Sequence, residues 1–435
     1  MNPEADGGAT ELLTRHRKVL PSWLALYYKE PIELVRGEGT RVWDGAGNEY
    51  LDFFGGIVTT ISGHMVQKML EALTKQANKI IHTSTGYLIR PMVNLAERLT
   101  ALAPIDVPTK AFFVNSGTEA IEAALLFATS WRRSNEIIAL RNSYHGRSFG
   151  AVAITGNKGW SATSFAPLNV SYALAPYCYR CPLGLTYPEW GLACAQDVRN
   201  VIETTTTGEP AAMIAEPIQG VGGLITPPPE YWQIVKGILD EFGIPLIADE
   251  VQTGFGRIGE AFWGIDSYGV RPDAIICAKG LGNGIAIGAV VGRADMVDSL
   301  RANSISTFGG NPLTTTFALA NLEYIQEQNL QPNAQKVGHF LMRKLKDRQE
   351  RYGRVGDVRG KGLMIGVEMV KDKKTKEPDP DGANQMIEIC KERGLLVGRG
   401  GLYGNVLRLS PPLIVTEEEA ARAIEVLETA FGSVK

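Results

Sequence analysis

Residues 244–284 read IPLIADEVQTGFGRIGEAFWGIDSYGVRPDAIICAKGLGNG. This stretch holds two short apolar runs, IPLIA and AIICA, and each leads directly into polar residues, Asp249 after the first and Lys279 after the second. Short apolar runs of this kind are typical of buried parallel strands. In an open parallel sheet, ligands bind beyond the carboxyl ends of the strands. We therefore expect Asp249 and Lys279 to lie together at a ligand-binding edge.

Helical periodicity alternates with apolar runs through the middle of the chain. Residues 65–80, 92–103 and 231–243 carry apolar side chains at helical spacing. The apolar run AFFVN at 111–115 leads into a helix that we expect to begin near Glu119. Strands that alternate with helices predict an α/β domain whose central sheet is mostly parallel and flanked by helices.

The two ends of the chain have a different pattern, and 435 residues are enough for two domains. Residues 32–54 read as strands joined by a Gly-rich turn. We expect residues 1–62 to form an N-terminal arm and part of a smaller α+β domain, residues 63–330 a large ligand-binding domain, and residues 331–435 the rest of the small domain. The elements expected in this last part are a helix at 337–351, strands at 359–370, 394–401 and 405–413, and a helix at 416–431 with a capping box.

The composition limits the partners of the protein. The 44 Lys and Arg residues are balanced by 47 Asp and Glu residues, which argues against nucleic-acid binding because a phosphate backbone requires a basic surface. No apolar run approaches the roughly 18 residues of a membrane span, and the first 18 residues lack the apolar core of a signal peptide. We expect a cytoplasmic protein without a membrane partner.

Five cysteines, an odd number, fit a reducing compartment. Cys178 and Cys181 have metal-ligand spacing, and Cys194 follows, but a closed zinc site needs four ligands and no His lies nearby to supply the fourth. The favoured interpretation is three reduced thiols in a loop-rich insert, so we expect no metal.

Lys279 is the first candidate for chemistry. Burial at a strand end lowers the pKa of a lysine and makes it a usable amine nucleophile. Gly280, Gly282 and Gly284 follow it and leave room for a planar ligand and a phosphate. The alternative is a lysine that reaches from the strand end to water.

Asp249 and Gln252 could serve the same ligand. A carboxylate at Asp249 can keep a pyridine nitrogen protonated, which makes the ring an electron sink. Gln252 could donate a hydrogen bond to the 3-oxygen of that ring. Taken alone, an Asp at this place is more often a turn residue or an N-cap.

A phosphate seat and a ring-stacking side chain are also available. Ser116-Gly117-Thr118 follows the strand AFFVN and opens a helix, and free N–H groups at a helix N-terminus bind phosphate. Tyr144-His145 follows the apolar run IIAL, where an aromatic ring could lie over a flat cofactor. Each segment alone is equally explained as a capped helix start or a loop aromatic.

Thr307, in STFGGNP, could supply another phosphate contact, or this segment is a Gly/Pro-rich turn. Together the candidates provide an amine, a partner for a pyridine nitrogen, a ring-stacking aromatic and a phosphate seat. These are the parts that an imine-forming pyridoxal-phosphate site requires.

The order of the motifs resembles that of the class III aminotransferases, which are fold-type-I enzymes dependent on pyridoxal 5′-phosphate (PLP). SGTEA, YHG, AEPIQGVGG, ADEVQTGFGR, AKGLGNG and STFGGNP occur in that order, and the likeness covers about residues 25–430. The insert APYCYRCPLGLTYPEWGLACA is most similar to the alanine–glyoxylate aminotransferase 2 branch. The resemblance implies transfer of an amino group from an amino acid or amine to a keto acid such as pyruvate or glyoxylate. An ω-amino-acid, amine or 4-aminobutyrate-type transaminase is the alternative.

The resemblance also implies a role for each candidate at the cofactor. Lys279 would form the Schiff base with PLP, Asp249 would pair with the pyridinium nitrogen, and Gln252 would contact the 3-oxygen. Tyr144, next to His145, would stack on the ring. Ser116, Gly117 and Thr118 would hold the phosphate.

For the substrate and the partner subunit, the resemblance implies three further residues. Arg408 would clamp a substrate carboxylate with two parallel hydrogen bonds. Glu216 is the residue that in related enzymes can pair with this arginine. Thr307 would reach the phosphate of the partner subunit's cofactor, which implies a homodimer with shared active sites and leaves a tetramer open. Two positions depart from the family pattern: Ile121, expected on a helix surface or at a subunit contact, replaces the usual Asn, and Val66-Gln67 replaces the usual His-Pro.

Two other classes of protein fit the sequence less well. A nucleotide-dependent dehydrogenase needs a G-x-G-x-x-G turn in an early βαβ unit, and none occurs there. A cofactor-binding regulator would carry a DNA-binding module, for which no residues remain.

Overall fold

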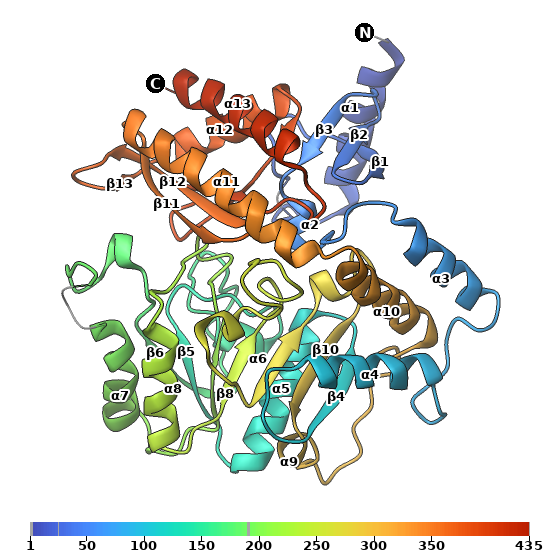
Figure 1. The fold of residues 1–435 in the computed structure, drawn as a ribbon, viewed down its shortest axis with the longest axis vertical. Helices are drawn as coiled ribbons and strands as arrows, with labels where there is room; N and C mark the ends of the chain where they lie inside the picture. The colour runs from blue at the N-terminus through green and yellow to red at the C-terminus, as the bar shows by residue number, and fades with distance from the viewer. Residues whose placement is uncertain (1–2, 25, 189–191, 435) are drawn as a thin grey trace.

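The computed structural model describes residues 3–24, 26–188 and 192–434. A seven-stranded sheet forms its centre, with the strand order β4-β10-β9-β8-β7-β5-β6 (Figure 1). Pairs among β5 to β9 are parallel, whereas β10 runs antiparallel to both of its neighbours. The expectation of a mostly parallel α/β sheet is confirmed. The strands are β4 (Thr109–Val114), β5 (Glu136–Leu140), β6 (Asn169–Ala173), β7 (Ala212–Ala215), β8 (Leu246–Asp249), β9 (Ala274–Cys277) and β10 (Gly288–Arg293).

Helices cover both faces of this sheet. Successive side chains of a strand point to opposite faces, so Ile137 of β5 packs in the cluster that contains α5, whereas Ile138 packs with α7 and α8. Every residue of β5, β7, β8 and β9 is buried, which explains why these strands are apolar except for Glu136 at the start of β5 and Asp249 at the end of β8. The helices of this part are α3 (Gln67–Ala77), α4 (Arg90–Leu102), α5 (Gly117–Arg132), α6 (Phe149–Ala153), α7 (Ala193–Thr205), α8 (Tyr231–Glu241), α9 (Ala294–Val297) and α10 (Pro312–Glu327).

The two chain ends meet in a second body of structure, shown in blue, orange and red in Figure 1. Strand β14 (Leu395–Leu396) pairs in parallel with β3 (Glu49–Asp52) and so completes the four-stranded sheet β1-β2-β3-β14. A five-stranded sheet lies beside it. Its strands are β11 (Val355–Lys361), β12 (Met364–Asp372), β13 (Glu377–Pro378), β15 (Gly398–Gly400) and β16 (Val406–Leu409). The remaining strands of the four-stranded sheet are β1 (Leu34–Glu38) and β2 (Arg41–Asp44). The helices of this second body are α1 (Pro3–Val19), α2 (Gly55–Val58), α11 (Leu330–Arg351), α12 (Pro380–Glu392) and α13 (Glu417–Ser433).

Local sequence signals succeed at several element ends and fail at others. The capping box of α13 is present, because Thr416 and Glu419 each accept from the backbone N–H of the other. The expectation for Ile121 is wrong: this side chain is fully buried in α5 against the sheet. Sequence analysis missed β6, β10, α7, α10 and α12 altogether.

None of the described helices combines the length and the apolar character needed to cross a membrane.

Candidate active site

A cavity of about 490 Å³ lies beyond the carboxyl ends of the parallel strands. Strand β8 ends at Asp249, and β9 ends two residues before Lys279. The two strands pair in parallel with Asp249 opposite Ile276, so both side chains enter the cavity from one sheet edge. Ten of the eleven site residues expected from the sequence line this cavity: Ser116, Gly117, Thr118, Tyr144, His145, Glu216, Asp249, Gln252, Lys279 and Arg408.

Lys279 lies in a short turn with unusual backbone geometry. Its φ angle is +39°, in the left-handed region that non-glycine residues rarely adopt. Burial lowers the pKa of Lys279 to about 8, and the positive charge of Arg408 adds to this effect, whereas Asp249 and Glu216 oppose it. The uncharged amine, which a nucleophile or a general base requires, is therefore far more populated near neutral pH than in an ordinary lysine.

Asp249 and His145 form a buried pair. His145 Nδ1 lies 2.7 Å from Asp249 Oδ2, and both side chains are almost fully buried. Burial alone would lower the pKa of His145, but the hydrogen bond and charge of Asp249, aided by Glu216, outweigh burial and raise it. Asp249 also accepts the backbone N–H of Val251 at 3.2 Å. Among the described residues nothing pairs with His145 Nε2.

The start of α5 faces the cavity. Ser116 is the N-cap, and its Oγ accepts the backbone N–H of Glu119 at 3.2 Å. The first N–H groups of a helix have no intrahelical partner, so those of Gly117 and Thr118 are available to an anion. A side chain at Gly146 would place its Cβ 2.4 Å from Thr118 Oγ1, so the chain passes close to this helix start only because residue 146 is glycine. This geometry matches a phosphate seat.

Arg408 and Glu216 both enter the cavity but form no ion pair with each other. Arg408 Nη2 donates to Gln252 Oε1 at 2.7 Å. Glu216 instead accepts the backbone N–H groups of Tyr144 and Gly220 at 2.9 and 2.8 Å. Burial raises the pKa of Glu216 to about 7, with His145 opposing the shift and Asp249 reinforcing it. The charge of Arg408 is therefore held on a neutral amide rather than cancelled by a carboxylate.

Aromatic side chains form part of the wall. The ring of Tyr144 meets that of Trp160 edge to face at 5.2 Å. Tyr27, from the N-terminal segment, also lines the cavity and donates its hydroxyl to the carbonyl of Arg399 at 3.1 Å. Sequence reasoning did not predict Tyr27, Trp160 and Ile57 as site residues, because only the tertiary fold brings their segments to the cavity.

Thr307 is the exception among the expected site residues. It is exposed and does not line the cavity of its own chain. The neighbouring Ser306 accepts a hydrogen bond from Asn115 at 3.4 Å, which places this loop beside the residue that precedes the Ser116 cap. Its predicted contact with a partner subunit's cofactor stays a prediction.

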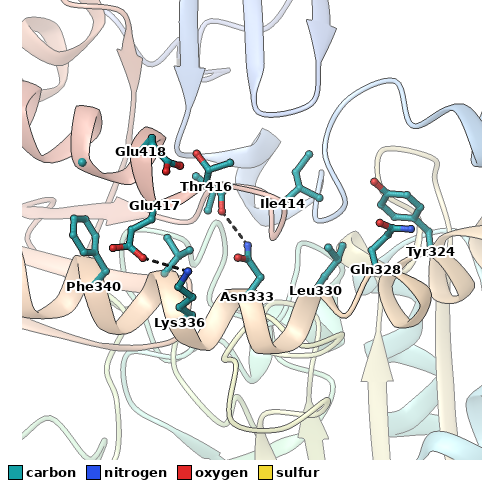
Figure 2. Close-up of a pocket in the computed structure, with 13 residues that line it drawn as sticks. Tyr324, Gln328, Leu330, Asn333, Lys336, Phe340, Ile414, Thr416, Glu417 and Glu418 are labelled. Carbon is teal, nitrogen blue, oxygen red and sulfur yellow. Dashed lines mark hydrogen bonds and ion pairs between the residues drawn. The ribbon is translucent and has the colours of Figure 1, made fainter.

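The cysteine-containing insert and a second cavity lie outside the site. Cys178 and Cys181 are partly exposed, Cys194 is buried, and all three are free thiols; residues 189–191 of this insert lie outside the described residues. Within the described part of the chain, no three His, Cys, Asp or Glu residues are arranged to hold a metal ion. A larger hollow of about 720 Å³ lies between α10, α11 and α13, and none of the expected site residues lines it (Figure 2).

Comparison with known proteins identifies the class of protein. The model of the aminotransferase class-III family matches residues 26–431, so the chain belongs to this family. Enzymes of this family depend on PLP, and the chain is a PLP-dependent aminotransferase. The resemblance stated from the motifs is confirmed.

Relatives and solved structures extend over nearly the whole chain. The chain is 39% identical to the leucine/methionine racemase of Thermococcus litoralis, covering 98% of this chain and 96% of that protein. It is 37% identical to the mitochondrial alanine–glyoxylate aminotransferase 2 homolog 2 of Arabidopsis thaliana, covering 99% and 89%. The PLP-bound amine transaminase of an uncultivated Pseudomonas species matches with a TM-score of 0.87 at 32% identity, covering 96% and 98%.

The residues present fit this cofactor. The cavity combines a helix start with free N–H groups, a buried carboxylate paired to a histidine, an aromatic wall and an amine of lowered pKa. When bound, PLP supplies an electron-withdrawing ring that stabilises negative charge on a substrate carbon.

Proposed function

We propose that this aminotransferase takes donors and acceptors that carry a carboxylate next to the reacting carbon, such as L-alanine, pyruvate and glyoxylate. The observation that supports this proposal is the arrangement of Arg408, Gln252 and Glu216. Because Gln252 holds the guanidinium through a neutral amide, the full positive charge of Arg408 remains available to a carboxylate. Glu216 is held by two backbone N–H groups and does not compete for it.

Lys279 performs the covalent and proton-transfer work in this proposal. Its amine would hold the cofactor covalently in the resting enzyme. When it is not bonded to the cofactor, the same amine would remove the proton from the substrate carbon and return a proton to the adjacent atom. A pKa of about 8 suits both directions, because the best general acid–base groups have a pKa near the working pH.

Asp249 and His145 hold a positive charge on the pyridine nitrogen in this proposal. The carboxylate of Asp249 lies at the end of β8, and His145 fixes its orientation through the 2.7 Å bond. The hydrogen bond and the charge of Asp249 raise the pKa of His145 against the effect of burial, which supports the pairing of these two side chains. Ser116, Gly117 and Thr118 would hold the phosphate at the start of α5.

Borohydride trapping tests the assignment of Lys279. Reduction of the purified protein followed by peptide mapping should place a pyridoxyl label on Lys279, and Lys279→Ala should lose both the label and multiple-turnover activity. An absorbance scan before and after L-alanine should show the band of the resting enzyme shift. A label on another lysine, or sustained turnover by Lys279→Ala, would contradict the proposal. The same scan with 1-phenylethylamine or 4-aminobutyrate tests the alternative donors.

We also propose that the enzyme works as a homodimer in the cytoplasm. Thr307 is exposed, and it follows Ser306, which accepts a hydrogen bond from Asn115 just before the start of α5; this position supports a role at a subunit boundary. Five free thiols fit a reducing compartment. Light scattering measures the molar mass in solution and so tests for the dimer. If the dimer forms, Thr307→Ala should weaken the binding of the cofactor.

Racemisation is a second candidate activity, because two relatives are named as amino-acid racemases, one of leucine and methionine and the other of alanine and serine. A racemase would have to return the proton to the opposite face of the substrate carbon. Incubation with L-leucine and L-alanine without any keto acid, followed by chiral chromatography, distinguishes the two activities. Accumulation of the D-enantiomer at a rate comparable to amino transfer would favour racemisation.

A further inference from the structure

The turn that carries Lys279 is strained and contains two non-glycine residues in the left-handed region. Lys279 has φ +39° and Asn283 has φ +43°, and Lys279 begins the one-turn helix η3 (Lys279–Leu281). Backbone in such regions persists only when the surrounding structure determines it. Contacts from neighbouring elements must therefore stabilise this turn.

Asn321 of α10 contacts this turn directly through two hydrogen bonds. Its Nδ2 donates to the carbonyls of Gly280 at 2.7 Å and of Leu281 at 3.0 Å, the two residues that follow Lys279. A one-turn helix leaves its last carbonyls without intrahelical partners, so one side-chain amide satisfies two of them. Asn321 is fully buried, and α10 is a sixteen-residue helix with a side-chain N-cap at Asn311.

The buried side chain of Ser62 fixes the orientation of this amide, and the buried side chain of Asn283 ties the same segment to the turn. Ser62 Oγ donates to Asn321 Oδ1 at 2.6 Å, so the Nδ2 group must face the two carbonyls. The backbone N–H of Ser62 donates to Asn283 Oδ1 at 2.8 Å, and Asn283 Nδ2 donates to the carbonyl of Gly63 at 3.0 Å. The three side chains form one network that joins the turn to α10 and to the segment at residues 62–63.

We propose that Asn321 is a positioning residue for the amino-transfer reaction. Through the carbonyls of Gly280 and Leu281 it sets the backbone of Lys279 and hence the direction of the ε-amine. Ser62 supports it by fixing the amide. This inference rests on the proposed role of Lys279, and it assigns Asn321 no contact with substrate or cofactor.

The test replaces Asn321 by leucine, which has a similar volume and no donor. Asn405→Leu is the matched control, because Asn405 is equally buried and also donates two hydrogen bonds, to the carbonyl of Met369 at 2.7 Å and to Glu368 Oε1 at 3.3 Å, and neither partner belongs to the turn. Thermal unfolding confirms that both variants fold. In the apoenzyme, the rate of covalent attachment of added PLP is followed by absorbance across pH, and kcat and KM for L-alanine are measured after loading.

We expect Asn321→Leu to slow attachment at least tenfold, to move the midpoint of its pH dependence away from that of the parent, and to lower kcat at least tenfold with KM within twofold. Asn405→Leu should change only the unfolding temperature. Attachment and kcat within twofold of the parent in folded Asn321→Leu would overturn the proposal. If Asn321→Leu does not fold, Ser62→Ala decides: attachment slowed about threefold supports the proposal, and an unchanged rate refutes it. A parent protein that carries no label on Lys279 contradicts the proposed function instead.

Discussion

The active-site cavity and a charged network around Glu368 both bury ionised side chains, but the two places differ in how these charges are paired. In the network, Glu368 is fully buried and pairs with Arg359 at 2.8 Å and with Arg180 at 2.5 Å, and it also accepts the hydroxyl of Tyr177. In the cavity, Lys279 and Glu216 are buried without a partner of opposite charge in direct contact. Pairing, rather than burial alone, therefore separates Glu368 from Lys279 and Glu216.

The pKa directions record this difference. Burial alone would raise the pKa of Glu368, but Arg359, Tyr177 and Arg180 together hold it below its usual value. The pKa of Glu216 is raised to about 7, and that of Lys279 is lowered to about 8, because burial dominates where no partner compensates. Paired charged groups stabilise the fold, whereas unpaired groups whose pKa lies near neutral pH can exchange protons.

The largest expected effect comes from breaking the network. Glu368→Ala removes a fully buried carboxylate, which leaves Arg180 without its ion-pair partner and Arg359 with Asp357 alone, and removing one partner of a buried pair costs about 3–5 kcal/mol. Urea denaturation should report a fall of this size in the free energy of unfolding. The control is Glu38→Ala, which breaks an exposed pair with Arg36 at 2.6 Å and should cost less than about 1 kcal/mol. Similar losses in both variants would remove the basis of the comparison.

Asp249→Asn tests the paired group within the cavity. The amide can keep a hydrogen bond to His145 but loses the charge that supports a protonated pyridine nitrogen. We expect kcat to fall by about 10²–10³, the range seen when one electrostatic group is removed from an active site. Steady-state kinetics with L-alanine and pyruvate measure it. Glu250→Gln changes the adjacent buried carboxylate, which faces Thr253, and should leave kcat close to that of the parent.

Gln252→Glu places a carboxylate beside Arg408. The positive charge of Arg408, which is available to a substrate carboxylate in the parent, is then paired within the protein. The new ion pair competes with the substrate carboxylate, and hydrogen bonds to charged groups contribute about 1.5–3 kcal/mol. We expect kcat/KM for L-alanine to fall about 10- to 100-fold more than kcat/KM for 1-phenylethylamine, which has no carboxylate. The ratio of the two losses is the measurement, because any effect on the cofactor is common to both donors. Equal losses would show that Arg408 does not bind the carboxylate.

The smallest expected effect is on the pH dependence of stability. Burial raises the pKa of Glu250 from its ordinary 4.5 to about 7, although Thr253 and two backbone N–H groups oppose the shift. Between these values the folded protein keeps a proton that the unfolded chain has lost. The free energy of unfolding therefore falls by about 1.4 kcal/mol per pH unit as the pH rises from about 5 to 7. Glu250→Gln should remove this contribution from the slope of the denaturation data, while the contribution of Glu216, whose pKa is also raised to about 7, remains. An unchanged slope would contradict the shift.

Much of this site was readable from local sequence patterns. Asp249 and Lys279 each follow an uninterrupted apolar strand, and Ser116 precedes an obvious helix start, so short-range signals placed all three at the ligand-binding edge of a parallel sheet. These predictions succeed because strand burial and helix capping depend on residues only a few positions apart. The motif order then identified the family.

Tertiary structure alone decided the rest. Strand β10 runs antiparallel, Ile121 is buried in the core, and Arg408 bonds to Gln252 instead of Glu216. Asn321 reaches the turn of Lys279 from a helix that sequence analysis missed. The sequence by itself determined which chemical groups this protein has and that they lie at strand ends and a helix start. Which buried charges find a partner depends on contacts between residues tens to hundreds of positions apart, and only the folded chain brings those residues together.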